Sequence, residues 1–261
     1  MNYEAYYDEL DRAMYDKLWW LDKVEDSVDT ILDFGCSNAA MYGAIREIMP
    51  GRFRYIGIDS DPRKLADAAA SYPEAAFFTG TDEAGGSFDS DRTVLVLSSV
   101  IHELYAYLSV EEAESLLKGL GETGCRHICI RDMELLIHAD DKKTGEMLLS
   151  AAENALPREL ALWKDLRGDL SARGLLEMFL SCVHTSNIER EMKESYFGMD
   201  SARLKEIFSE NYSAIYEEHF QIPYMIRRWR KEIFLPSGND LSADEVRSIA
   251  DTHTKILFDR K

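Results

Sequence analysis

The sequence predicts an α/β protein built on a doubly wound, mostly parallel sheet. Short apolar runs alternate with stretches of helical periodicity, a pattern typical of strand–helix–strand units. Short right-handed crossovers between such units force the strands to lie parallel. Strands are expected near residues 31–34, 54–58, 76–78, 94–98 and 126–131, and two more at 212–220 and 254–258.

The segment 30–40 (TILDFGCSNAA) carries the strongest functional signal. An apolar strand stops at Asp33, makes a tight turn of small residues and enters a helix, which leaves backbone N–H groups free for a ligand. The second predicted strand ends in Asp59. The separation along the chain between the turn and Asp59 suits a carboxylate that binds the ribose hydroxyls of a nucleoside. Together, the two features indicate a nucleoside-cofactor site.

Residues 33–39 (DFGCSNA) resemble the Asp/Glu-x-Gly-x-Gly-x-Gly loop of class I S-adenosylmethionine-dependent methyltransferases. Residues 97–104 (LSSVIHEL) resemble the strand-four segment of many small-molecule members. The resemblance covers most of residues 30–135 and, more loosely, the final strands. It implies a Rossmann-like sheet of seven strands closed by an antiparallel pair. The loop departs from the family pattern at Ser37 and Ala39, where glycine is usual, and only glycine takes positive φ without steric cost.

The same resemblance implies S-adenosylmethionine as the cofactor and assigns its contacts. Asp33 would steady the loop or the amino-acid end of the cofactor, and Asp59 would bind the ribose. Thr81 and Asp82 stand where the family commonly places an adenine contact, although Asp82 as a cap of the next turn is an equal alternative. The expected cofactor-binding residues are Asp33, Gly35, Cys36, Ser37, Asp59, Ser60, Thr81, Asp82, Ser98 and Ser99.

Four residues at the ends of the fourth and fifth predicted strands are the catalytic candidates: His102, Glu103, Arg131 and Asp132. A histidine titrates near neutrality and suits acid–base work. The simpler interpretation is that His102 has a structural role and only forms a hydrogen bond to a backbone group. An arginine can hold a substrate carboxylate or phosphate, whereas Arg131 and Asp132 can also form a plain ion pair.

Composition narrows the classes of function. The 261 residues carry a formal net charge of −18, which argues against broad nucleic-acid binding because phosphate neutralisation needs clustered cations. No apolar run is long enough to span a bilayer, and the polar start (MNYE) is unlike a signal peptide, so we expect a cytoplasmic protein without membrane association.

The four cysteines are too few and too scattered for a disulfide framework. Cys125 and Cys129 bracket His127 but lack a second ligand pair at zinc spacing, so we expect small core side chains and no metal ligands.

Four regions are expected along the chain. Residues 1–29 form an N-terminal helical segment, with a helix or helix pair over 3–26. Residues 30–139 form the cofactor-binding core, and residues 199–261 complete the sheet, with an insertion at 222–251. Residues 140–198 are a helical insertion after the fifth strand, longer than a crossover requires. We interpret this insertion as a cap over the acceptor site, the alternative being a bundle packed on the sheet edge.

These features favour an S-adenosylmethionine-dependent methyltransferase that acts on a small-molecule or peptide-like acceptor. An RNA acceptor is the second choice and depends on the basic cluster Arg227–Lys231, for which a solvated helix face is the simpler interpretation. A non-catalytic binding or regulatory protein is the alternative from another class, because of Ser37 and Ala39. A nicotinamide dehydrogenase fits less well, since Gly35-x-Ser37-x-x-Ala40 matches its fingerprint no better.

Overall fold

A single seven-stranded sheet, in the order β3-β2-β1-β4-β5-β7-β6, organises the protein. The computed structural model describes residues 14, 16–138, 142–182, 188–194 and 196–261. Strands β1 to β5 pair in parallel, and β7 runs antiparallel to both β5 and β6. This confirms the predicted fold class, including the closing antiparallel pair. The strands are β1 (Thr30–Phe34), β2 (Arg54–Ile58), β3 (Ala76–Phe78), β4 (Thr93–Ser98), β5 (His127–Ile137), β6 (Tyr212–Phe220) and β7 (Ala250–Arg260).

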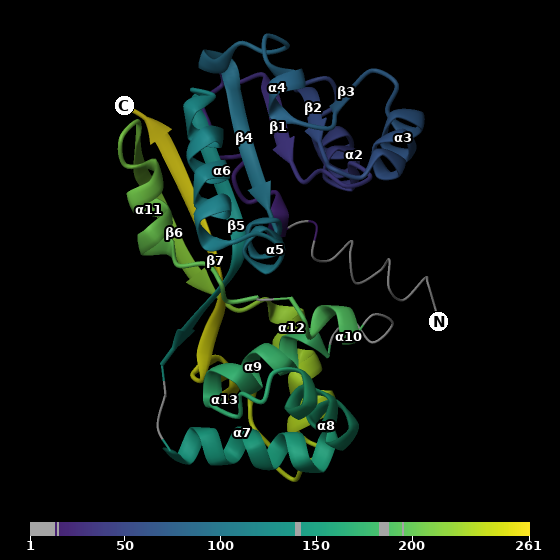
Figure 1. Cartoon of the computed structure of the whole chain (residues 1–261), viewed down its shortest axis with the longest axis vertical. Helices are drawn as coiled ribbons and strands as arrows, with labels where there is room; N and C mark the ends of the chain where they lie inside the picture. The colour runs from purple at the N-terminus through teal and green to yellow at the C-terminus, as the bar shows by residue number, and fades with distance from the viewer. Residues whose placement is uncertain (1–13, 15, 139–141, 183–187, 195) are drawn as a thin grey trace.

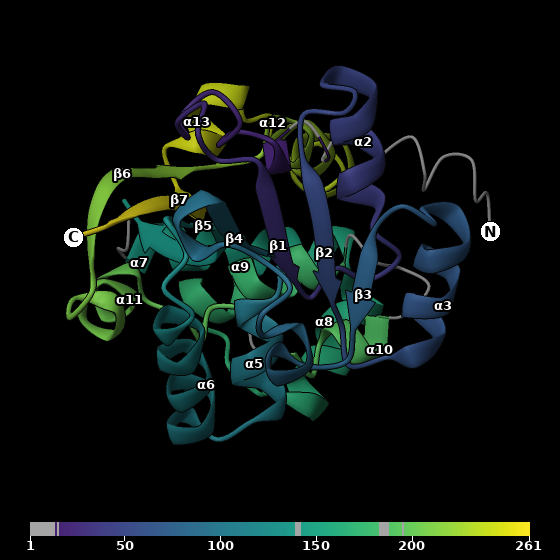
Figure 2. The ribbon, with the colours of Figure 1, turned by 90° about the horizontal axis from the view of Figure 1, so that it is seen from above.

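Helices cover both faces of the sheet (Figure 2). Alternate residues of each central strand enter opposite cores, as the two-residue period of a strand requires. Leu95 and Leu97 pack with α6 and α11, whereas Val94 and Val96 pack with α2 and α3. The flanking helices are α2 (Ala40–Ile48), α3 (Pro62–Ser71), α4 (Thr81–Ala84), the 3₁₀ turn η1 (Ser90–Arg92), α5 (Ile101–Tyr107), α6 (Val110–Glu122) and α11 (Ser201–Phe208).

Strands β5 and β7 are longer than the sequence predicts. Their pairing continues past the edge of the parallel sheet, with Met133 opposite His253 and Ile137 opposite Ala250, and an irregularity between Met133 and Leu136. The sequence predicts a shorter strand because polar residues interrupt the apolar run of β5 in this stretch. The stretch is nevertheless a strand, because pairing with a distant strand satisfies the hydrogen-bonding groups of its backbone. The extension forms a two-stranded arm that leads into the helical part of the molecule (Figure 1).

Both insertions pack together as one helical unit, here called the helical subdomain. A single apolar core joins them, with Trp163 and Phe179 from the first insertion and Trp229 and Phe234 from the second. The subdomain lies beyond the carboxyl ends of the parallel strands (Figure 1). It comprises α7 (Lys142–Ala155), α8 (Pro157–Leu166), α9 (Ala172–Ser181), α10 (Ile188–Glu191), α12 (Pro223–Trp229), the π-helical turn η2 (Arg230–Phe234) and α13 (Ala243–Arg247).

The N-terminal segment differs from the predicted helix. Residues 16 and 17 are helical, but residues 18–24 form successive turns. Trp20 is fully buried against Phe53, and Trp19 stacks on Tyr216 with ring centroids 5.2 Å apart. Packing of this pair on the sheet therefore outweighs the helical periodicity of the sequence. Residues 1–13 and 15, which carry the first part of that predicted helix, lie outside the described residues.

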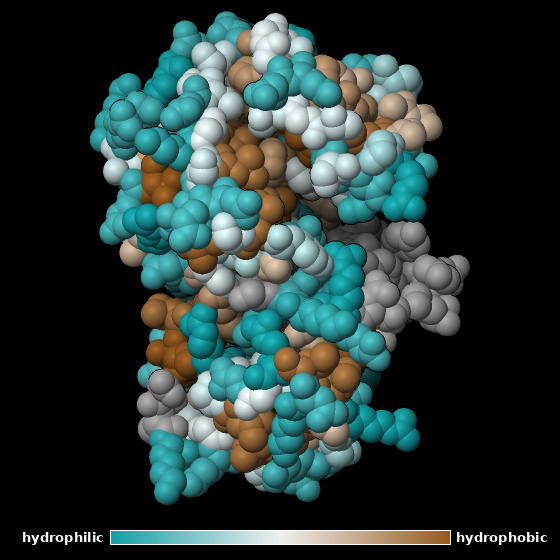
Figure 3. All heavy atoms as spheres, in the orientation of Figure 1, coloured by the Kyte–Doolittle hydropathy of each residue, from teal (hydrophilic) through white to brown (hydrophobic). Residues whose placement is uncertain are grey.

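Within the described ranges, none of the helices combines the length and the apolar character needed to cross a membrane. The face of the molecule seen in Figure 3 is largely hydrophilic, with separate apolar patches on the sheet-containing part and on the helical subdomain.

Candidate functional site

The loop after β1 has the backbone geometry of a glycine-rich loop. Gly35, Ser37 and Ala39 have φ angles of 79°, 51° and 59°. A Cβ at Gly35 would lie 2.5 Å from Cγ2 of Val100, so only glycine fits there. Ser37 and Ala39 adopt the left-handed conformation, although this conformation costs an L-residue about 1–2 kcal/mol. The loop therefore has left-handed backbone at two residues other than glycine.

Asp59 ties this loop to the end of β2. Its Oδ2 accepts the backbone N–H of Ser37 at 2.9 Å, and its Oδ1 accepts that of Asp61 at 2.9 Å. The parallel register places Phe34 opposite Ile58, so both strands end at the same point. Asp59 is half-buried, and Ser60 follows in an exposed turn. The predicted ribose-binding carboxylate thus lies directly beside the predicted cofactor loop.

Asp33 lies buried at the end of β1, next to a cation that the sequence analysis missed. The hydroxyl of Tyr55 donates a hydrogen bond to Asp33 Oδ2. Burial raises the pKa of Asp33 to about 6, although this hydrogen bond and the charge of Lys17 act in the opposite direction. Lys17 is half-buried, and its burial together with the charge of Arg131 lowers its pKa.

Cys36 offers a ligand neither a reactive thiol nor a free backbone N–H, and the expectation that the N–H groups of Gly35 and Cys36 are left for a ligand is wrong, because β2 takes both. Its side chain is buried over β2, where a Cβ added to Gly57 would lie 2.7 Å from Cys36 Sγ. Burial raises the pKa of this thiol. The backbone N–H groups of Gly35 and Cys36 both donate to the carbonyl of Ile58, at 2.8 and 3.0 Å.

Thr81 and Asp82 begin α4, beside the end of β3. Their neighbour Glu83 accepts hydrogen bonds from the N–H and the hydroxyl of Thr79, at 3.0 and 2.9 Å. The N-cap of α4 is Gly80, so the alternative role of Asp82 as a helix cap is wrong. Asp82 is exposed and Thr81 is half-buried.

The ends of β4 and β5 form the second half of the site. Arg131 is 4% exposed, and its guanidinium donates to Ser99 Oγ at 2.8 Å and to Asp16 Oδ2 at 2.9 Å. Asp16 also pairs with Lys255 at 2.6 Å. Arg131 is therefore engaged by protein groups, which fits the ion-pair alternative, although with Asp16 rather than with Asp132. Ser98 Oγ is buried without a hydrogen-bond partner in the described part of the chain.

His102 and Asp132, two of the catalytic candidates, contact each other. Asp132 Oδ1 lies 2.7 Å from His102 Nδ1, and Asp132 Oδ2 accepts the N–H groups of Val100 and Ile101 at 2.9 and 2.6 Å. Burial lowers the pKa of His102, but the Asp132 carboxylate outweighs burial and raises that pKa above its ordinary value. The carboxylate thus fixes the ring and the start of α5 together.

The helical subdomain reaches this dyad. The ring of Tyr196 packs edge-on against His102 with centroids 5.5 Å apart. Tyr107 of α5 donates to Glu194 Oε1 at 2.7 Å, and Arg190 lies 3.9 Å from Glu103 Oε1. These contacts place the first insertion at the edge of the sheet where the parallel strands end.

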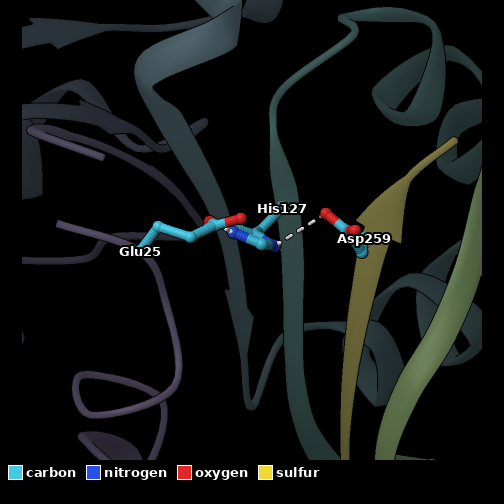
Figure 4. Close-up of side chains that lie close together, drawn as sticks. All are labelled: Glu25, His127 and Asp259. Atoms are coloured by element: carbon cyan, nitrogen blue, oxygen red, sulfur yellow. Dashed lines mark hydrogen bonds and ion pairs between the residues drawn. The ribbon is translucent and has the colours of Figure 1, made fainter. Parts of the chain in front are cut away.

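A third polar cluster, at the opposite end of the sheet, holds the N-terminal segment in place. His127 starts β5 and lies between Glu25 and Asp259 (Figure 4). Glu25 contacts Nε2 of the ring, whereas Asp259 lies 3.4 Å from Nδ1. Because the two carboxylates approach opposite nitrogens, the ring lies between the N-terminal segment and β7.

The basic cluster Arg227–Lys231 is a helix face whose aromatic residue is buried. Trp229 is 2% exposed and belongs to the core of the helical subdomain. Arg228 pairs with Glu232 at 2.8 Å, and Arg230 donates to the carbonyl of Leu241 at 2.6 Å. Trp229 is therefore not available to stack on a base.

The sequence matches no family model and no curated protein sequence. Its structure resembles solved methyltransferase structures. PKMT2 from Rickettsia typhi in complex with AdoHcy is 12% identical with a TM-score of 0.51, and the match covers 91% of this chain and 49% of that one. This chain thus spans about half the length of PKMT2.

Two other similar structures match over most of their length. A putative sarcosine dimethylglycine methyltransferase from Galdieria sulphuraria is 10% identical, with 96% of this chain and 85% of that one covered and a TM-score of 0.51. The plantazolicin methyltransferase BpumL, in complex with a monoazolic desmethylPZN analog and SAH, is 15% identical, with 97% and 83% covered and a TM-score of 0.50. The chain has the class I S-adenosylmethionine-dependent methyltransferase fold.

Proposed function

We propose that the protein is an S-adenosylmethionine-dependent methyltransferase that acts on a small-molecule or peptide-like acceptor. The observation that carries this proposal is the loop after β1. Ser37 and Ala39 keep the left-handed conformation that the family assigns to glycine, and Asp59 is hydrogen-bonded to that loop. If this loop conformation had no function, the protein would be more stable with Ser37 and Ala39 in unstrained backbone conformations.

Each end of the cofactor has a chemically suitable partner at this edge. Asp59 would accept hydrogen bonds from the ribose hydroxyls, and Thr81 and Asp82 lie at the adjacent strand end for the adenine. The cofactor's amino-acid end carries an ammonium and a carboxylate. Asp33 suits the ammonium and Lys17 suits the carboxylate by charge, and each side chain shifts the pKa of the other.

The acceptor would lie between His102 and the helical subdomain. Methyl transfer from a sulfonium requires an acceptor held in line and water excluded, with a base where the acceptor carries a proton. His102 Nδ1 is engaged by Asp132, so Nε2 is the nitrogen left to orient the acceptor or take its proton. The cap role of residues 140–198 is part of this proposal, supported by the Tyr196 and Glu194 contacts with α5.

The structures with bound ligands favour small or peptide-like acceptors over RNA. BpumL is described with a desmethylPZN analog and SAH together. The burial of Trp229 removes the aromatic partner on which the RNA alternative depended. A non-catalytic binding protein stays the alternative from another class, and it predicts cofactor binding without turnover.

Binding of S-adenosylmethionine to paired lysine variants tests the cofactor assignment. Lys17→Met should weaken binding at least about tenfold, because a charge-assisted contact is worth about 1.5–3 kcal/mol. Lys118→Met, on the exposed side of α6, should leave affinity unchanged. Equal affinities in both folded variants would remove Lys17 from the site.

A further inference from the structure

Two side chains beside the proposed acceptor position, His102 and Glu194, each have one polar atom held by the protein and another left over. Asp132 engages Nδ1 of His102, and Nε2 has no partner among the described residues. His102 is only 4% exposed, so this nitrogen lies in a largely enclosed space. A buried imidazole oriented in this way by a carboxylate is the usual arrangement of a metal-binding histidine.

Glu194 shows the same division. Its Oε1 accepts the hydroxyl of Tyr107 at 2.7 Å and two nitrogens of Arg190 at 3.0 Å each. Its Oε2 makes no hydrogen bond within the described ranges, although the residue is 3% exposed. Hydrogen bonds to one oxygen fix the carboxylate and leave the other oxygen to bind a cation.

Glu103 completes the set from α5. Its carboxylate is 44% exposed, and Arg190 lies 3.9 Å from Oε1. One ligand atom from each of His102, Glu103 and Glu194 lies within 4.8 Å of the others.

We propose that His102, Glu103 and Glu194 bind a divalent first-row transition-metal ion at the methyl-transfer edge. One imidazole and two carboxylates suit zinc, manganese or iron better than calcium or magnesium, which prefer oxygen ligands alone. Asp132 and Tyr107 supply the outer hydrogen bonds that orient such ligands. Three protein ligands leave coordination positions for water or for an oxygen or nitrogen of the acceptor.

Arg190 is the competing cation at this position. One guanidinium faces two carboxylates and therefore leaves a net negative charge. The Arg190 side chain is 58% exposed, so it can turn away without disturbing a core. Ion binding thus replaces the single positive charge of the Arg190 side chain with the double positive charge of a bound metal ion. No metal site was expected from the sequence, where only the spacing of Cys125, His127 and Cys129 was weighed as a ligand pattern; Glu194 lies far from His102 along the chain.

The ion binding does not rest on the proposed methyl transfer, but the ion's role in the reaction does. A metal-bound His102 would be a ligand rather than a base. The ion would then bind the acceptor heteroatom directly and lower its pKa.

Titration of the chelator-treated, full-length protein with Zn²⁺, and with Co²⁺ followed by visible absorption, tests the site. We expect one ion per chain. Glu194→Gln and His102→Ala should each weaken binding at least about tenfold. The exposed-histidine control His138→Ala should not change it. Arg190→Gln should strengthen binding, whereas a purely structural ion pair would give destabilisation with no change in ion affinity.

Absence of saturable binding, or equal binding in Glu194→Gln, His102→Ala and wild type, would overturn the metal site. Circular dichroism and S-adenosylmethionine affinity, measured on the same samples, show that each variant is folded. Cofactor binding without ion binding rejects this inference alone, and ion binding without cofactor binding rejects the proposed function alone.

Discussion

Asp59 accepts the backbone N–H of Ser37 at 2.9 Å and so joins the end of β2 to the loop after β1. Ser37 has a left-handed backbone, and the hydrogen bond helps to hold its N–H in that orientation. The residue expected to bind the ribose therefore also shapes the loop expected to surround the cofactor.

Substitution of Asp59 should separate these two contributions. Asp59→Ala should weaken S-adenosylmethionine binding by roughly tenfold or more, because a charge-assisted hydrogen bond is lost. Asp59→Asn, which keeps one acceptor oxygen, should lose less. Asp61→Ala is the matched control: Asp61 caps α3 by accepting the N–H of Arg63, so its loss should change stability rather than affinity. Calorimetry gives the affinities, and equal affinity in all three folded variants contradicts the assignment.

Ser37→Gly should stabilise the protein. Glycine removes the left-handed steric strain of about 1–2 kcal/mol but adds chain entropy in the unfolded state, which leaves a net gain of about 0.5–1 kcal/mol. Ala44→Gly, within α2, should instead destabilise by about 1 kcal/mol. Urea denaturation measures both changes. A loss of stability in Ser37→Gly would show that the serine side chain stabilises the folded protein by more than its left-handed backbone destabilises it.

Asp33 should make stability depend on pH. Its pKa is raised to about 6 in the folded protein, against about 3.9 in an unfolded chain. Well below the unfolded pKa of about 3.9, Asp33 is protonated in both states. As the pH rises from 4 to 6 the unfolded chain loses its proton first, so the native state loses stability in that window.

Asp33→Asn removes this titration. Its stability relative to wild type should therefore increase between pH 4 and pH 6.5, by up to about 2–3 kcal/mol. Urea denaturation of both proteins at several pH values measures the difference, in which the titration of other groups largely cancels. A difference that stays constant across this range would place the Asp33 pKa near its ordinary value.

His102 should be required for turnover but not for cofactor binding. With an acceptor that supports turnover and carries a proton, His102→Ala should lower kcat by about 10²–10⁴-fold. His102→Gln can hydrogen-bond but cannot titrate near neutrality, so it separates orientation from proton transfer. Activity retained in Gln but not in Ala favours orientation. Full activity in both variants returns His102 to a structural role.

The parallel strands were predictable because each is a local apolar run with turn residues at its ends. Asp33 and Asp59 stand at strand ends, where the sequence places them directly. The extension of β5 was not predictable from such a run, since Asp132 and Glu134 interrupt it. Its pairing partner, β7, lies more than a hundred residues further along the chain.

The contacts within the site depend on tertiary structure and were not available from the sequence. His102 and Asp132 were separate candidates, and only the pairing of β4 with β5, with Ser98 opposite Arg131, brings them together. Lys17 and Asp16 lay in a segment whose periodicity predicts a helix or helix pair leading into the sheet. Glu194 belongs to an insertion whose docking on α5 has no local signal.

The burial of Trp229 did have a local signal. Met225, Ile226, Trp229 and Ile233 recur at the three- and four-residue spacing of a buried helix face, and all four are buried. That spacing was a better guide to Trp229 than its basic neighbours.

Calorimetric titration of the wild-type protein with S-adenosylmethionine, AdoHcy and NAD tests the central claim most directly. The account predicts saturable one-to-one binding of S-adenosylmethionine and AdoHcy, with affinity reduced in Asp59→Ala, and no binding of NAD. Binding of NAD alone, or no binding of either sulfur cofactor to the folded protein, would contradict it.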